Sequence, residues 1–246
     1  MLVPSHHGRL GTFWSAPKRR SARNLKLADP DIFELTNVQR QLGASRETIG
    51  RNKAEVVAEQ IYALTGDVNL DVFPEGIMPE TAEEFVNGCD YVMDQMEFFQ
   101  IKNRYALHRA FRASDRCQFM LKIPTVAHST IIFLYTKNSM PIEQVYDIDE
   151  DAEITPEVTR RLMERIMPEV PAFPSDKTLD HWFVDEGKMP IFGACPPLAE
   201  GVLVERLAQE IMDIPGRTPL PPQPGYAIFD TLTWTAKLVE KASWAK

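Results

Sequence analysis

From residue 24 onward, short apolar runs alternate with longer stretches in which apolar residues recur at every third or fourth position. Short apolar runs bounded by polar residues predict buried strands, and the longer pattern predicts amphipathic helices. The expected strands are 24–28, 69–73, 91–94, 119–123, 130–136 and 227–233. The expected helices are 49–65, 81–87, 101–111, 157–167 and 198–212. The pattern therefore indicates a chain in which strands and helices take turns.

This alternation predicts the fold class. Strands separated by helices of ten or more residues are typical of a mostly parallel sheet with helices on both of its faces. We therefore expect an α/β protein with a Rossmann-like sheet. In such sheets ligands bind beyond the carboxyl ends of the strands, and Asp29 and Asp94 each stand at the end of an expected strand.

Two segments depart from the alternation. Residues 1–23 are basic and show no helical stripe, so we treat them as an atypical segment that precedes a single domain spanning 24–246. Residues 137–190 carry many acidic residues and prolines, and their apolar content is too interrupted to close a core of its own. We expect this second segment to be a crossover or lid region within the domain.

Composition narrows the class of protein. Of the 246 residues, 44% are hydrophobic and 25% are charged, as in ordinary globular proteins. Acidic residues outnumber basic ones 35 to 27, and the net charge of −8 argues against general binding to nucleic acid. The three cysteines are too scattered for a disulfide framework or a zinc site, and they fit a reducing cytoplasm. The apolar runs fall far short of the roughly 20 residues of a membrane helix. We therefore expect a cytoplasmic protein with neither a nucleic-acid partner nor a membrane span.

Polar residues that could hold a nucleotide follow the first expected strand. An Asp at this place, such as Asp29, can accept hydrogen bonds from ribose hydroxyls. Asn37, Arg40 and Lys53 add a neutral donor and two cations, which suit a triphosphate. Asp94, at a neighbouring strand end, could hold Mg²⁺ directly or through water. A single Asp after a strand is more often a turn former or a helix cap, so the prediction depends on the joint pattern.

Five segments make that joint pattern more specific. They are Asp29-Pro-Asp31, Phe33-Glu-Leu-Thr-Asn37-Val-Gln-Arg40-Gln41, Ile49-Gly50-Arg-Asn-Lys53, Val92-Met-Asp94-Gln-Met-Glu97 and Gly193-Ala-Cys-Pro196-Pro-Leu-Ala-Glu-Gly201. Together they resemble the motifs of the ThiF/MoeB/HesA adenylyltransferase family, which includes the ubiquitin-activating enzymes. In the fourth segment, Glu97 stands where the family has a second Asp. The resemblance runs from about residue 24 to residue 212, and 29–53 is its most specific part.

The resemblance implies an activity, cofactors and partners. In this family a substrate carboxylate, often the C-terminal glycine of a ubiquitin-like carrier protein, attacks the α-phosphate of ATP and leaves an acyl-adenylate and pyrophosphate. The residues that it assigns to ATP binding are Asp29, Asp31, Asn37, Arg40, Gln41 and Lys53, and those that it assigns to catalysis are Arg40, Lys53 and Asp94. Asp29 would bind the ribose, Lys53 would stabilise charge on the phosphates, and Asp94 would position Mg²⁺. The implied partner is a carrier protein or peptide with a C-terminal carboxylate, and the implied assembly is a homodimer or heterodimer.

The chain departs from the family at the glycine loop that cradles the phosphates. The loop Gly-x-Gly-Gly-x-Gly falls on Ser5-His-His-Gly8-Arg-Leu10, which retains one glycine of the four, and Pro17 interrupts the helix that should follow. Glycine is needed there because a side chain would occupy the space of the phosphates. We therefore expect the first strand–glycine loop–helix unit to be absent or distorted. We also expect weak binding of Mg-ATP and negligible pyrophosphate exchange.

Several interpretations stay open at this point. Residues 1–23 could come from a frameshifted or mis-started reading of the gene. Alternatively, the chain is a diverged family member that serves as a non-catalytic partner or scaffold subunit, or it is an active enzyme with an unusual loop. Outside the family, an NAD-dependent oxidoreductase is a weaker alternative, because Asp29 suits NAD equally well but Arg40 and Lys53 would be unexplained. Cys117 is the one plausible acceptor thiol, although a buried free cysteine is the commoner case. The sequence thus leaves open whether this chain is itself an active nucleotidyltransferase.

Overall fold

The computed structural model describes residues 24–169, 171, 173, 175–186, 192–242 and 244–245. The basic segment 1–23 lies outside these residues, and so does the expected loss of the first strand–glycine loop–helix unit.

The amino-terminal half contains a small parallel sheet. Its strands β1 (Asn24–Ala28) and β2 (Asn69–Phe73) pair in parallel and are joined by the helix α1 (Lys53–Thr65). Parallel neighbours need such a crossover connection, which the helix α1 provides. Leu27 and Ile61 belong to the apolar cluster that forms between the two strands and this helix.

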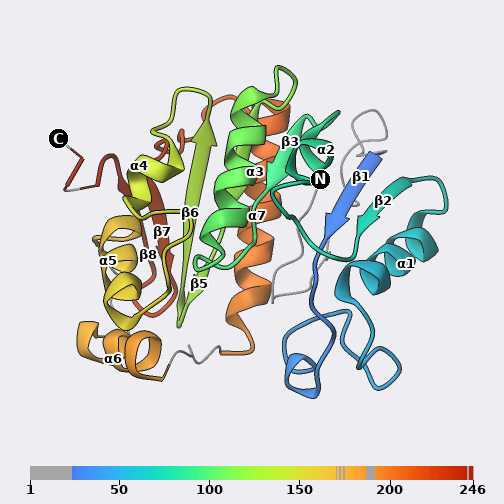
Figure 1. Ribbon diagram of the computed structural model, residues 1–246, viewed down its shortest axis with the longest axis horizontal. Helices are drawn as coiled ribbons and strands as arrows, with labels where there is room; N and C mark the ends of the chain where they lie inside the picture. Colours follow the sequence, from blue (N-terminus) through green and yellow to red (C-terminus); the bar gives the residue numbers. More distant parts are fainter. Residues whose placement is uncertain are drawn as a thin grey trace.

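A second, mixed sheet forms the larger part of the molecule (Figure 1). Its strands are β3 (Tyr91–Met93), β4 (Phe119–Lys122), β5 (Thr125–Val126), β6 (Ser129–Thr136), β7 (Tyr226–Asp230) and β8 (Thr235–Val239). They follow the order β3-β4-β6-β7-β8, with β5 paired to β6. β3 and β4 are parallel, whereas β6, β7 and β8 are antiparallel to their neighbours.

Helices cover both faces of the second sheet. One face carries α2 (Ala82–Val86), α3 (Ile101–Ala113), α4 (Ile142–Tyr146) and α5 (Pro156–Ile166), and the other carries α7 (Cys195–Met212). β6 shows the consequence: Phe133 and Tyr135 pack on the α3 side, and Ile132 and Leu134 pack on the α7 side. Burial on both faces explains why this strand is an unbroken apolar run rather than an alternating one. The short helix α6 (Asp176–Asp180) precedes a π-helical turn over His181–Asp185.

The Rossmann-like α/β class is confirmed, with one difference in the sheet. The parallel pairs are in the first half of the fold, and the last strands are antiparallel because β7 and β8 form a hairpin around a tight turn. The segment 137–190, for which one helix was predicted, holds α4, α5 and α6. No helix in the described part of the chain is long and apolar enough to cross a membrane.

Among the described strands, β1 and β3 each pair along one edge only. In the doubly wound strand order, the first strand of the chain lies between the second and the fourth.

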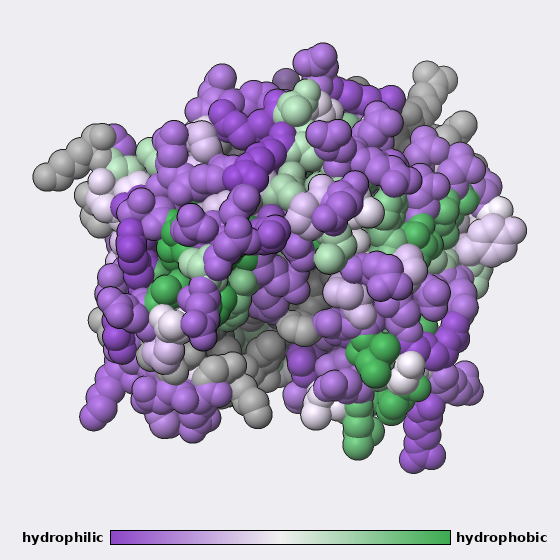
Figure 2. Space-filling model, viewed as in Figure 1, coloured by the Kyte–Doolittle hydropathy of each residue, from purple (hydrophilic) through white to green (hydrophobic). Residues whose placement is uncertain are grey.

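The long connection between β1 and α1 exposes several large apolar side chains. These are Ile32, Leu35, Val38, Leu42 and Ile49. Apolar surface is visible at the lower right of Figure 2, where Figure 1 places this connection. The same connection contains Asn37, Arg40 and Gln41, so the predicted nucleotide residues are held in a partly apolar loop.

Candidate functional site

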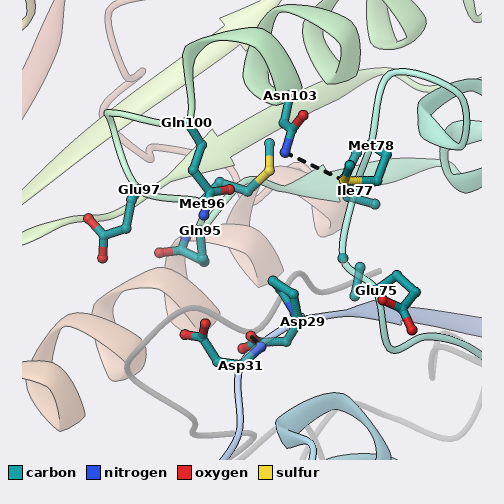
Figure 3. Close-up of a pocket in the computed structure, with 13 residues that line it drawn as sticks. Asp29, Asp31, Glu75, Ile77, Met78, Gln95, Met96, Glu97, Gln100 and Asn103 are labelled. Carbon is teal, nitrogen blue, oxygen red and sulfur yellow. Dashed lines mark hydrogen bonds between the residues drawn. The ribbon is translucent and has the colours of Figure 1, made fainter. Parts of the chain in front are cut away.

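The carboxyl ends of β1, β2 and β3 open onto a cavity of about 150 Å³. Its polar lining comprises the carboxylates Asp29, Asp31, Glu75 and Glu97 and the amides Gln95, Gln100 and Asn103. Figure 3 shows Asp29 and Asp31 on one side of the cavity and Gln95, Glu97 and Gln100 across from them. Ligands of open α/β sheets bind at such strand ends, so this cavity is the candidate site.

Asp29 and Asp31 leave β1 in different environments. Asp29 is buried, and its Oδ1 accepts a hydrogen bond from the backbone N–H of Asp31 at 2.9 Å. The Asp31 side chain is 40% exposed, and its Oδ2 lies 3.0 Å from the Nζ of Lys53. Lys53 is itself only 2% exposed, at the first turn of α1. The site thus presents an accessible carboxylate that is paired with a buried ammonium group.

Asn52 fastens the strand ends to α1. Its Nδ2 donates to the backbone carbonyls of Asp29 at 2.8 Å and Pro74 at 3.1 Å. Its Oδ1 accepts the backbone N–H of Glu55 at 3.1 Å and so caps the helix. Asn52 was not among the predicted site residues, although an Asn directly before a helical pattern is a recognised N-cap signal.

The loop with Asn37, Arg40 and Gln41 has buried polar groups. Asn37 Oδ1 accepts the backbone N–H of Glu34 at 3.0 Å, so its side chain shapes a 3₁₀ turn. Arg40 donates from Nη1 to the carbonyl of Thr36 at 2.7 Å, and burial lowers the pKa of its guanidinium. The Nε of Arg40 and both polar amide atoms of Gln41 are buried with no hydrogen-bond partner among the residues that the structure describes. Such orphaned groups call for a physical explanation, and a bound polar ligand is one.

The amino terminus of α7 lies beside this loop. A Cβ placed on Gly193 would come within 3.3 Å of the backbone oxygen of Gln39. The Gly-Ala-Cys-Pro segment therefore approaches the predicted phosphate-binding loop closely.

Asp94 lies outside the cavity lining, in a fully buried cluster of charges. Its Oδ2 accepts two hydrogen bonds from Arg104, from Nε at 3.0 Å and from Nη2 at 2.5 Å, and lies 3.5 Å from the Nε2 of His108. Its Oδ1 accepts the backbone N–H of Met96 at 2.9 Å and lies 3.9 Å from the Nζ of Lys122. The carboxylate has no exposed surface.

The cluster fixes the protonation of its members. Burial alone would raise the pKa of Asp94, but Arg104 and Lys122 outweigh it and hold that pKa well below its usual range. Burial lowers the pKa of Lys122 to about 8 and that of His108 to about 4. At neutral pH the cluster therefore contains one carboxylate, two cations and a neutral imidazole.

The surroundings of Asp94 do not suit Mg²⁺, which prefers several oxygen ligands including water. Two cations already share the carboxylate. In the described part of the chain, no group of three or more His, Cys, Asp or Glu side chains could hold a metal ion. The role that sequence analysis assigned to Asp94 stays a prediction that this geometry does not favour.

Cys117 is equally enclosed. Its side chain is buried, and burial raises the pKa of its thiol to about 12. A thiol held protonated in this way is a poor nucleophile, because the thiolate is the reactive form.

The family model described as ThiF family matches residues 19–132. This range contains β1 to β5, the start of β6 and every residue that lines the cavity.

Residues 19–132 thus belong to a ThiF family domain.

Two curated relatives each match between 34% and 39% of the chain. A tRNA threonylcarbamoyladenosine dehydratase of Haemophilus influenzae is 33% identical over 85 residues, which cover 34% of this chain and 33% of that protein. A SAMP-activating enzyme E1 of Haloferax volcanii is 30% identical over 95 residues, covering 39% of this chain and 32% of that protein. The alignments thus span about a third of the length of these relatives.

Solved structures share the fold over most of the chain. PaaA superposes with a TM-score of 0.59 at 16% identity, covering 87% of this chain and 63% of PaaA. E. coli MccB with ATP gives 0.57 at 14% identity, covering 91% and 58%. E. coli TcdA, a tRNA N6-threonylcarbamoyladenosine dehydratase, gives 0.52 at 18% identity, covering 86% and 84%. At such identities the likeness establishes the fold alone.

Proposed function

We propose that the chain is an ATP-dependent adenylyltransferase of the ThiF, or ubiquitin-like modifier-activating, type. One observation carries the proposal: the Asp31–Lys53 pair stands at the carboxyl ends of the parallel strands of a ThiF domain, beside a cavity. Carboxylates at this place can accept ribose hydroxyls, and a cation there can meet phosphates.

The nucleotide would lie across the strand ends. Asp29 and Asp31 would face the ribose, because both line the cavity. Lys53, Arg40 and Gln41 would meet the phosphates, whose oxygens would accept hydrogen bonds from the Nε of Arg40 and the Nε2 of Gln41. A buried cation next to a phosphate interacts more strongly than an exposed one, because water screens it less.

The reaction would be an in-line displacement at phosphorus. A carboxylate oxygen of the substrate forms a bond to the α-phosphorus, and the bond from that phosphorus to the bridging oxygen of the β-phosphate breaks. Pyrophosphate leaves with the bonding electrons, and the acyl-adenylate remains. Lys53 and Arg40 would stabilise the charge that moves onto the phosphate oxygens, since fixed cations need no reorganisation during the step.

The substrate would be a carrier protein or peptide that ends in a free carboxylate. Two neighbouring structures of E. coli MccB were solved with MccA species, and one relative is named a SAMP-activating E1. These names support a polypeptide acceptor for this chain. The homodimer or heterodimer implied by the family resemblance stays a prediction.

A second candidate is a non-catalytic partner subunit. The replacement of three loop glycines in residues 5–10 favours it, because side chains there would crowd the phosphates. For the same reason we expect this chain to bind Mg-ATP with a dissociation constant above the micromolar range and to show negligible pyrophosphate exchange.

Thermal melting with a panel of nucleotides tests the proposal, because a ligand that binds the folded state raises Tm. We expect millimolar Mg-ATP to raise Tm and NAD at the same concentration to leave it unchanged. A rise with NAD alone would favour the oxidoreductase, and no rise with either would favour the partner subunit. Carboxylate-dependent exchange of pyrophosphate into ATP then separates an active enzyme from a subunit that binds nucleotide without catalysis.

A further inference from the structure

The buried cluster around Asp94 points to a role other than metal binding. We propose that Asp94 is an internal counter-ion which positions the cavity wall, and that this chain binds nucleotide without a divalent cation held by Asp94. The inference rests on the proposed function for the nucleotide itself. At the place that the family resemblance assigns to Mg²⁺, the side chains of Arg104 and Lys122 surround the carboxylate of Asp94.

Arg104 occupies the coordination space of the carboxylate. The Nε and Nη2 of its guanidinium group donate hydrogen bonds to Oδ2 of Asp94 at 3.0 and 2.5 Å, and neither side chain has exposed surface. Charge-assisted hydrogen bonds of this kind are among the strongest in proteins. A metal ion could bind Oδ2 only after the guanidinium had moved away.

Aromatic rings hold the two cations in place. The guanidinium carbon of Arg104 lies 5.4 Å from the ring centre of Phe98 and 5.2 Å from that of Tyr146. Lys122 Nζ lies 4.8 Å from the ring centre of Phe98. Because the rings attract both cations in a desolvated setting, moving Arg104 would sacrifice these contacts as well as the ion pair.

Electrostatic repulsion also disfavours a metal ion at Asp94. The carboxylate of Asp94 already faces the positive charges of Arg104 and Lys122. A divalent cation would add two more positive charges at close range in a buried setting, where water screens repulsion poorly. The donor set around Asp94 therefore disfavours Mg²⁺ by sign as well as by geometry.

The cluster acts instead on the wall of the cavity. Asp94 Oδ1 accepts the N–H of Met96, and the Nζ of Lys122 donates to the carbonyl oxygen of Met96. Both backbone polar groups of Met96 are thus bound to the cluster. Gln95, Met96 and Glu97 form the wall that faces Asp29 and Asp31 across the cavity, so the cluster positions this wall (Figure 3).

The decisive experiment compares how nucleotide binding depends on metal in two proteins. The dissociation constant of ATP is measured by isothermal titration with Mg²⁺ and again with EDTA, in the wild type and in the double variant D94N/R104M. This variant removes both partners of the pair, which buried pairs tolerate better than the loss of one partner. We expect the ratio of the two constants to agree between the proteins within about twofold. The inference would be overturned if EDTA weakened ATP binding more than about tenfold in the wild type and left it unchanged in the double variant.

A second measurement decides the matter even if ATP does not bind, an outcome that would refute the proposed function instead. Mn²⁺ is titrated into each protein without nucleotide, and the free ion is followed by electron paramagnetic resonance. We expect the two proteins to leave the same amount of Mn²⁺ free. Retention of Mn²⁺ by the wild type that the double variant loses would show that Asp94 binds metal.

The single variant D94N separates a counter-ion from an inert carboxylate. It leaves Arg104 buried without its charged partner, so it should melt well below the wild type. Adding R104M should restore part of the loss in Tm. If D94N melted with the wild type, or if R104M lowered Tm further, Asp94 would not be the counter-ion of Arg104.

Discussion

At the scale of single residues, the buried charges of this domain are paired by groups from distant parts of the chain. Lys53 meets Asp31, and Asp94 meets Arg104 and Lys122. A buried ion pair contributes little net stability, but the loss of one partner is costly. The pairs therefore act mainly by fixing where each charge stands, which is what a phosphate-binding site requires.

His108 makes the stability of the protein depend on pH. Burial lowers its pKa to about 4, whereas in the unfolded chain its pKa is about 6.5. Between these values the unfolded chain binds a proton that the folded protein excludes, so the free energy of unfolding falls as the pH falls from 6.5 to 4. The total loss should reach about 3 kcal/mol.

Urea unfolding at pH 7.0, 5.5 and 4.5 measures this loss. The variant H108Q should lose less stability across the range than the wild type does. His181 is exposed and provides the matched control, so H181Q should follow the wild type. Identical losses in the wild type and H108Q would show that another group sets the pH dependence.

At the scale of elements, the entry into α1 joins the helix to both strands of the small sheet. Asn52 both caps α1 and donates to carbonyls at the ends of β1 and β2. The variant N52D keeps an oxygen for the cap but loses the amide donor, and it places a negative charge beside those carbonyls. We expect it to lower the free energy of unfolding by about 1–3 kcal/mol.

Denaturant unfolding of N52D beside T155A checks this expectation. Thr155 caps α5 through the N–H of Val158 and has no comparable role at a strand end. T155A should cost about 1 kcal/mol, as ordinary caps do. A smaller cost for N52D than for T155A would mean that the donor to the strand ends contributes nothing.

Gly76 is a second constraint at the cavity, because it has φ of +76° and lies against Pro30. A Cβ on Gly76 would lie 2.8 Å from the Cδ of Pro30, whereas one on Gly88, with φ of +78°, would meet no atom within 4 Å. Alanine at Gly88 should therefore cost about 1–2 kcal/mol, the penalty of the left-handed conformation alone. Alanine at Gly76 should cost more and should weaken nucleotide binding.

The two glycine variants are compared by urea unfolding and by the rise of Tm with ATP. Equal losses of stability in G76A and G88A would show that Pro30 can move aside for the added Cβ without a loss in the free energy of unfolding. An undiminished rise of Tm in G76A would show that this turn does not shape the site.

The sequence predicted most of the elements but not their ends. Periodicity located most strands and helices between 24 and 136 to within a few residues, but it missed the 3₁₀ turn Leu35–Asn37 and the two-residue strand β5, which are too short to show a period. The last expected strand, 227–233, stops at Asp230, whose Oδ1 accepts the N–H of Leu232 and turns the chain. β8 was missed because it lies at the sheet edge with four of its five residues exposed, so no alternation marks it.

The candidate site was predictable only where a motif marks it. The resemblance pointed to Asp31 and Lys53, and the structure joins them in an ion pair. The partners of Asp94 had weaker signals: Arg104 and His108 are four residues apart on one helix, and Lys122 interrupts an apolar strand. The contacts of these residues with Asp94 depend on how the helix packs against the strand, which the sequence does not specify.

At the scale of the whole molecule, the candidate site lies where the two sheets meet. β1 and β2 supply the acidic side, and β3 with its following loop supplies the wall across the cavity. The protein has a net charge of −8, which opposes the approach of a nucleotide. The buried cations must therefore act locally, and added salt should weaken ATP binding less than it weakens contacts between exposed charges.

Isothermal titration of ATP into the wild type, K53M and K237M tests the central claim most directly. Lys237 also pairs with a carboxylate, that of Glu169, but stands on β8, so it controls for the loss of a lysine from an ion pair. We expect the wild type and K237M to bind ATP with equal affinity, weaker than micromolar, and K53M to bind at least about tenfold more weakly. Equal affinity in K53M and K237M would contradict a nucleotide site at the Asp31–Lys53 pair.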